Sequence, residues 1–171
     1  MNEVMTTQLV ANEWLNDILL FLIYLISALI LLYVGKLIFR AFKSKINFQD
    51  QLVEQDNLAF GFAYVGYMAG LLMAVGSAIY GPSLGLVTDL VDMALFGLLA
   101  IALLNLSSFI FDRVTLRRFS IWKEITQDRN IGMGVIEGAN YFASGLIIFG
   151  AITGESGDLA MGLTTALGYW L

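Results

Sequence analysis

The sequence contains no cysteine, no histidine and only one proline. Without cysteine there can be no disulfide bond, thiolate nucleophile or cysteine metal site. Without histidine the chain lacks the commonest catalytic base, the His-Glu-x-x-His zinc site and the serine–histidine pair. No phosphate-binding loop or dinucleotide fingerprint occurs either. We therefore expect a protein that is not an enzyme and that holds no metal and no cofactor.

Charge is also scarce, at 13% of the 171 residues, whereas 58% are hydrophobic and the mean hydropathy is +0.79. A soluble domain carries about 25% charged residues. The charges avoid four apolar runs, each near the roughly 20 residues that cross a bilayer. The sequence thus predicts an all-α polytopic membrane bundle in a lipid bilayer, and its net charge of −5 argues against nucleic acid as a partner. The spans are expected at about 17–42, 58–80, 90–111 and 131–153.

The basic residues occupy only two regions. All nine belong to the linker after the first span, with the end of that span, or to the linker after the third span. They are Lys36, Arg40, Lys43 and Lys45 in the first region, and Arg113, Arg117, Arg118, Lys123 and Arg129 in the second. Because basic loops stay on the cytoplasmic side, we expect linkers 43–57 and 112–130 in the cytoplasm of a bacterial inner membrane, and the N-terminus outside.

Two glycine-rich stretches resemble each other. Residues 57–81 align with residues 130–154 at an offset of 73, and the same offset pairs basic residues of the two linkers. The matching positions include Asn57 with Asn130, Gly61 with Gly134, and Arg40 with Arg113. We predict a duplicated hairpin, and both copies enter the bilayer from one side, so the repeats are parallel. The expected organisation is an extracytoplasmic segment at 1–16, hairpins at 17–81 and 82–154, and an apolar tail at 155–171.

The linkers themselves allow two interpretations. Residues 48–56 and 119–128 could form short amphipathic helices on the inner leaflet, and an apolar stripe in the second linker favours this. The stripe consists of Phe119, Ile121, Trp122 and Ile125. The alternative is a solvated loop whose basic residues only set the topology.

Glu137 lies well inside the fourth predicted span. An ionised carboxylate there costs about 3 kcal/mol, so we expect it to be protonated, paired or exposed to water. Asn140 follows on the same face, and the repeat places Tyr64 and Tyr67 at the equivalent positions. The expected polar patch contains Glu137, Asn140, Tyr64, Tyr67 and Asn105. It is either part of a proton or ion pathway, or a neutral lock in which Glu137 bonds Tyr64, Tyr67 or Asn105.

Small residues recur at four-residue spacing in the second and fourth spans. They are Gly66, Gly70 and Ala74 in the second span, and Gly134 and Gly138 in the fourth. Such faces let helix backbones approach closely. The pattern predicts helix contacts without saying which helix is the partner.

The tail from Leu159 to Leu171 is apolar but, at about 1.5 Å per residue, reaches only roughly 20 Å. It is too short to cross a core of about 30 Å. We expect either the start of a further helix in a longer natural chain, which we favour, or a half-helix packed against the bundle.

Two tandem hairpins, each with a basic linker followed by Asn-x-(Ala/Gly)-x-Gly, resemble the YjfL-like bacterial inner-membrane family, domain of unknown function 350. The residues that carry this resemblance are Asn57, Ala59 and Gly61 in one copy, and Asn130, Gly132, Gly134 and Glu137 in the other. It covers about residues 17–154 and implies a four-helix inner-membrane protein with no established activity.

These observations predict a non-catalytic membrane protein that self-associates as a homo-oligomer, or that docks a cytoplasmic or membrane protein partner, through its small-residue faces and basic linkers. The alternative is an oligomeric ion or proton channel, or a small transporter, with Glu137 in the pathway. The two differ in where Glu137 points, toward a wet lumen or into a dry helix contact.

Overall fold

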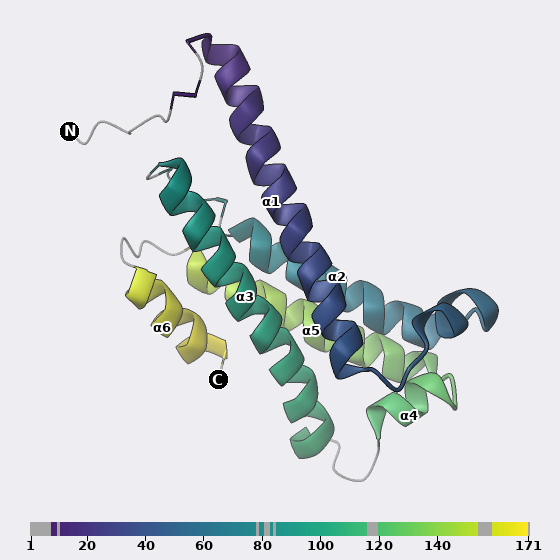
Figure 1. Ribbon diagram of the computed structural model, residues 1–171. Coiled ribbons are helices and arrows are strands. Elements are labelled where there is room, and N and C mark those ends of the chain that lie inside the picture. The colour runs from purple at the N-terminus through teal and green to yellow at the C-terminus, as the bar shows by residue number, and fades with distance from the viewer. Residues whose placement is uncertain are drawn as a thin grey trace.

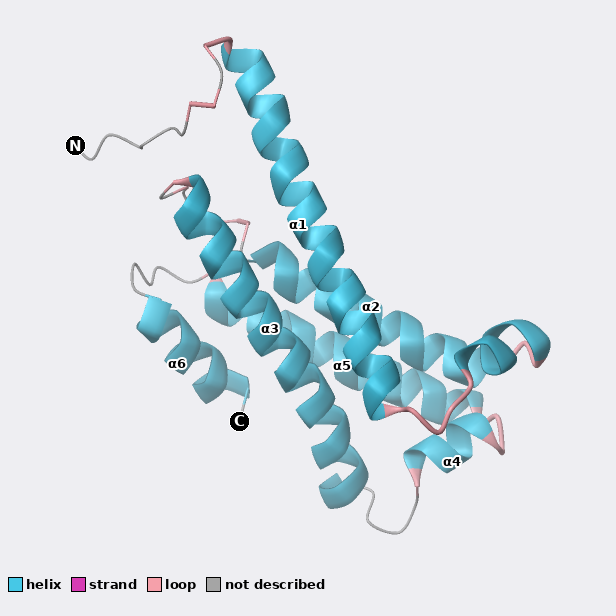
Figure 2. Ribbon diagram, in the orientation of Figure 1, coloured by secondary structure: helices cyan, strands magenta, loops and turns pink. Residues whose placement is uncertain are grey.

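The computed structural model describes residues 8–9, 11–77, 79–80, 83, 85–115, 120–153 and 159–170. Their regular structure is entirely helical (Figure 2). Four helices are long and apolar enough to cross a bilayer, which confirms the predicted membrane class. They are α1 (Glu13–Phe42), α2 (Leu58–Ser77), α3 (Leu86–Ile110) and α5 (Ile131–Ile152).

The third span begins at Leu86, four residues before the predicted Leu90. Gly85 precedes it with a φ of 116°, a conformation that glycine adopts without strain. Asp89 therefore lies inside the first turn, where its carboxylate suits the helix dipole. That carboxylate accepts hydrogen bonds from the hydroxyls of Tyr24 at 2.6 Å and Ser83 at 2.5 Å. The bond from Tyr24 joins the start of α3 to α1.

The long helices form two pairs (Figure 1). In this view α1 and α3 both run from upper left to lower right, and α2 and α5 both run back behind them. The α1–α2 and α3–α5 connections therefore lie at one end of the bundle, and the starts of α1 and α3 lie at the other. We call the first end, formed by residues 43–57 and 120–130, the linker platform.

The closest helix contact is between α2 and α5, which lie side by side and parallel. Gly134 meets the backbone of Ala59 near their first turns, and Gly66 meets that of Gly138 further along. Gly145 meets Gly70 just past the middle of both helices. At each of these glycines an added Cβ would overlap backbone atoms of the other helix. Small residues are therefore required along this whole contact.

An aromatic cluster fills the bundle where α1 ends. Phe39 is fully buried at its centre and stacks on the Tyr67 ring at a centroid distance of 4.3 Å. The other rings around Phe39 are Phe48, Tyr64, Trp122 and Tyr141, each 5.7–5.9 Å away. They come from the first linker, α2, α4 and α5, so one side chain joins the end of α1 to four other parts of the chain.

The linkers each contain a short helical turn, η1 (Asp50–Glu54) and α4 (Ile121–Thr126). The two turns lie within the segments that the amphipathic-helix interpretation named, and the apolar stripe of α4 packs against the protein, whereas Val53 of η1 is 67% exposed. Ile121 and Ile125 are fully buried in the core that also contains Phe39. The end of the bundle presents an apolar surface, and burying these residues on it removes that surface from water. Phe119, also part of the predicted stripe, is outside the described residues.

The tail contains a further helix, α6 (Leu159–Trp170), which packs against α5. The Trp170 side chain, at the end of α6, packs against the hydrophobic core. The helix therefore begins where the sequence predicted a fifth apolar segment, and it is shorter than the spanning helices.

Candidate intramembrane polar cluster

Glu137 is fully buried between α5 and α3. The Ser108 hydroxyl of α3 donates a hydrogen bond to its Oε1. Oε2 of Glu137 has no hydrogen-bond partner among the described residues, and neither has the buried hydroxyl of Tyr141 one turn further along α5. Tyr141 lies close enough to Glu137 and Ser108 to interact with both electrostatically, so the three residues form one group in a closed helix contact.

A second group of hydrogen bonds joins the same two helices nearer the middle of α5. The Ser107 hydroxyl donates to Oδ1 of Asn140 at 3.0 Å, and the Ser144 hydroxyl donates to Ser107 at 2.9 Å. The Asn140 amide nitrogen has no partner among the described groups. The predicted Asn140 is therefore in the cluster, where it accepts from Ser107.

Tyr67 and Asn105 belong to a third group, between α1, α2 and α3. The Tyr67 hydroxyl donates to the Gly35 carbonyl of α1 at 3.0 Å, and the Asn105 amide donates to the Tyr67 oxygen at 3.3 Å and to the Ile101 carbonyl at 2.7 Å. The Tyr67 ring lies 5.2 Å from that of Tyr141, edge to face. This contact connects the third group to the first.

Tyr64, the remaining predicted member, takes no part in these hydrogen bonds. It is half-buried and lies against the rings of Phe39 and Phe48, both 5.9 Å away. The structure therefore brings together four of the five predicted residues and places Tyr64 at the edge of the aromatic cluster.

Lys43, directly after α1, closes the cluster on the side of the linker platform. Its ammonium lies 4.0 Å above the Trp122 ring. Burial lowers the pKa of Lys43 to about 8, whereas the electrostatic attraction of Glu137 and Asp112 acts in the opposite direction. Lys43 is thus the basic group that faces Glu137 from the platform.

The sequence-based prediction missed Ser107, Ser108, Ser144 and Tyr141. The available signal was the run Asn105-Leu-Ser-Ser108 at the end of an apolar span, since polar residues there face other helices. In chemical terms the cluster can hold a proton or hydrogen-bond two helices together. Among the described residues no group of three potential metal ligands occurs, and no metal site is suggested there.

The predicted packing residues all lie in helix contacts or the core. Gly66, Gly70, Gly134 and Gly138 lie against α2 or α5 backbone, and Ala74 is fully buried. Gly145 was missed, although it follows Gly138 at a spacing of seven residues. Gly61 of the repeat motif is different, because an added Cβ there would meet no atom within 4 Å.

The two motif asparagines, Asn57 and Asn130, both begin a spanning helix. Oδ1 of Asn57 accepts from the Phe60 N–H at 3.2 Å, and Oδ1 of Asn130 accepts from the Met133 N–H at 3.3 Å. These are N-cap bonds, which satisfy backbone donors that the first turn leaves free. Asn57 is also buried and donates to Gln51 at 2.6 Å and to the Ile125 carbonyl at 2.9 Å.

These features define the class of protein, a polytopic α-helical membrane bundle with a buried polar cluster. A family model for a domain of unknown function, DUF350, matches residues 13–152. The chain belongs to this family, which confirms the resemblance to domain of unknown function 350. The comparisons found no match among curated proteins or solved structures.

Proposed function

We propose that this chain is a non-catalytic membrane scaffold that self-associates in the bilayer and holds a folded platform for a cytoplasmic protein partner. The observation that carries the proposal is the ordered contact between the two linkers. Arg129 donates to the side chain of Gln55 at 2.7 Å, Asn57 reaches the Ile125 carbonyl, and Lys43 lies over Trp122. Loops that only connected spans would need no such network.

The interior supports a scaffold and not a pathway. Glu137 is fully buried in a helix contact, which is the dry position that the sequence-based hypothesis assigned to a scaffold. The small-residue faces of α2 and α5 are occupied by each other within the chain. They cannot also serve a second copy, so self-association needs another surface.

We assign self-association to α1. Its 30 residues span about 45 Å, longer than a hydrocarbon core of about 30 Å. Its first half extends beyond the other helices in Figure 1, and Ile26, Ile30 and Tyr33, which share one side of the helix, are each more than half exposed. A second copy of α1 could cover this side.

Single-molecule photobleaching tests the assignment, because the chain has no cysteine and Gln127→Cys provides one exposed dye site. We expect two or more bleaching steps per particle in dilute vesicles. Ile26→Ala with Ile30→Ala should shift the particles to single steps, since it removes apolar contact area on α1. Leu146→Ala with Ile147→Ala, on the exposed side of α5, is the matched control and should leave the count unchanged. Single steps for the unmodified chain would contradict self-association.

The proposal places the platform in the cytoplasm of a bacterial inner membrane. Its support is the confinement of all nine basic residues to the two linkers and the adjoining helix ends. The cysteine of Gln127→Cys should react with a membrane-impermeant maleimide only from the cytoplasmic side, and that of Ala11→Cys only from the outside. Both positions are exposed. The opposite sidedness would reverse the orientation.

We also infer that the two hairpins arose by duplication, and local geometry at the offset of 73 supports this. Asp56 and Arg129 both have a positive φ, 46° and 50°. In both copies the next residue is a capping asparagine, whose N–H donates to the carbonyl six residues before it at 2.9 Å. Those carbonyls belong to Gln51 and Glu124, whose side chains also accept from the asparagine amides.

A proton channel or transporter is the second candidate function. The observation that favours it is the pair of buried polar atoms without a hydrogen-bond partner among the described groups, Oε2 of Glu137 and the Tyr141 hydroxyl. With Lys43 on the platform side, these groups could pass a proton inward. The two functions are separated by a flux measurement, described at the end of the Discussion.

A further inference from the structure

A groove runs along the lipid-facing side of the α1–α2 contact. It has a volume of about 340 Å³ and is lined by Leu32 of α1 and by Tyr64, Val65, Met68, Ala69 and Leu72 of α2. The α2 residues cover about 12 Å along the helix. Val65 and Leu72 are 64% and 56% exposed, so the groove opens outward. Apart from the Tyr64 hydroxyl, its lining side chains are apolar.

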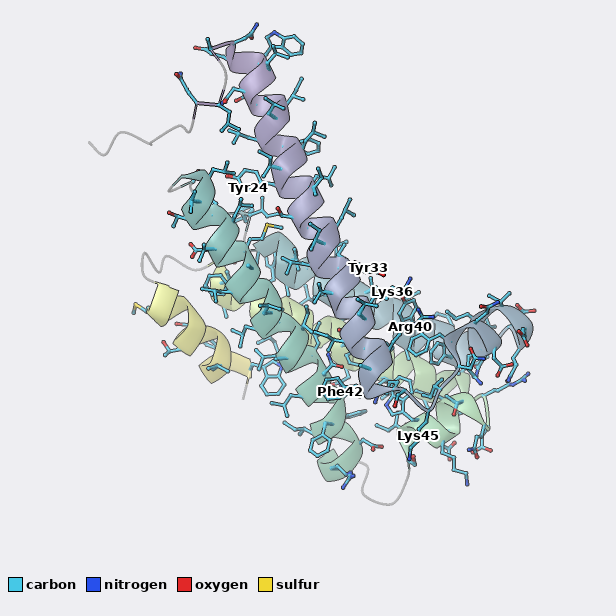
Figure 3. The ribbon with its side chains drawn as sticks, in the orientation of Figure 1. Tyr24, Tyr33, Lys36, Arg40, Phe42 and Lys45 are labelled. Atoms are coloured by element: carbon cyan, nitrogen blue, oxygen red, sulfur yellow. The ribbon has the colours of Figure 1, made fainter. Side chains whose placement is uncertain are left out.

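Two positive charges stand at the end of the groove nearest the linker platform. Lys36 follows Leu32 by one helical turn and Arg40 follows by two, so the three share one side of α1. Figure 3 shows Lys36 and Arg40 descending that side toward the first linker. Arg40 lies 5.2 Å from the Phe48 ring centre and interacts electrostatically with Tyr64, the groove residue nearest this end.

These charges are not neutralised by the protein. The described residues include no carboxylate that pairs with Lys36 or Arg40, and neither cation is buried. Both long side chains can extend from α1 to the level of the lipid headgroups. The groove therefore joins an apolar channel in the acyl-chain region to a doubly positive site at headgroup depth.

We propose that this groove binds an anionic phospholipid, with one acyl chain along Met68 and Leu72 and the phosphate held by Lys36 and Arg40. The Tyr64 hydroxyl is a further donor to the headgroup. A free phosphate would gain nothing from the apolar lining, and a zwitterionic lipid would gain less from two unpaired cations. Charge and shape together therefore select a lipid with a net negative headgroup. This inference goes beyond the scaffold proposal and does not depend on self-association.

Native mass spectrometry of the full chain, with phosphatidylglycerol and phosphatidylcholine of identical acyl chains, tests the headgroup contact. We expect preferential retention of phosphatidylglycerol, and Lys36→Gln with Arg40→Gln should reduce the preference about twenty-five-fold, which is about fivefold for each cation. Lys45→Gln, an exposed cation beyond the groove, is the matched control and should keep the preference. Inorganic phosphate should not displace the lipid. Equal retention of the two lipids, an unchanged preference in the double variant, or displacement by phosphate would overturn the proposal.

Photo-crosslinking of the unmodified chain tests the position without any substitution. A phosphatidylglycerol with a diazirine in its acyl chain should label residues 64–72 several times more strongly than the exposed face of α5. Ala69→Trp should abolish this labelling by filling the groove. Even labelling of all lipid-facing helices, or a groove covered by a second copy and not labelled, would overturn the assignment.

Discussion

Gly138→Ala is expected to destabilise the bundle by about 1–3 kcal/mol or more, the range for overpacking a filled contact. The added Cβ would lie 2.6 Å from the backbone oxygen of Phe62. A backbone atom cannot move aside as the end of a side chain can, so α2 and α5 would have to separate. Gly66 already touches Gly138 at this level, and the separation would weaken that contact too. Thermal unfolding in detergent should show a clearly lower midpoint.

Gly150→Ala provides the matched control on the same helix. Its added Cβ would meet no atom within 4 Å. Alanine favours helix over glycine by up to about 1 kcal/mol, so this variant should be as stable as the parent or more so. If Gly138→Ala unfolded at the parent temperature, the close α2–α5 contact described above would be wrong. Equal damage at both positions would mean that the glycines matter for another reason.

Glu137→Leu is expected to lower the free energy of unfolding by about 1–3 kcal/mol, because it removes the acceptor of a buried hydrogen bond. The Ser108 hydroxyl donates to that carboxyl in the parent chain and would lose its partner between α3 and α5. Glu137→Gln keeps the size and an acceptor oxygen, and its effect should be much smaller. The comparison uses equilibrium unfolding in mixed micelles.

Two other outcomes would argue against a hydrogen-bonded lock. If Glu137→Leu were as stable as the parent, the buried bond to Ser108 would contribute nothing. If Glu137→Gln were as damaging as Glu137→Leu, the carboxyl group itself would be required, and the amide could not replace it.

The sequence predicted the spanning helices well because hydropathy is a local property. It also located Asn57 and Asn130 at the starts of α2 and α5, since a capping residue acts on its own first turn. It could not identify which helices pair. Gly66 and Gly138 are 72 positions apart, and a four-residue spacing marks a face without naming its partner.

The polar cluster was only partly predictable, because a hydrogen-bond partner on another helix leaves no local signal in the sequence. Glu137 stood out as a carboxyl inside an apolar run, but its partner Ser108 lies 29 residues away on another helix. The apolar stripe containing Ile121 and Ile125 could be recognised in the sequence. Its helical spacing alone does not tell whether that face contacts lipid or protein. That depended on the apolar surface left at the end of α1 by Phe39.

The measurement that most directly tests a closed scaffold against a pathway is proton flux through the unmodified chain. The protein would be reconstituted into liposomes that contain a pH-sensitive dye, under a pH gradient and a potassium diffusion potential. We expect acidification at the rate of protein-free liposomes, for both the parent chain and Glu137→Gln. A faster rate in the parent that disappears in Glu137→Gln would contradict the scaffold and establish Glu137 as part of a proton pathway.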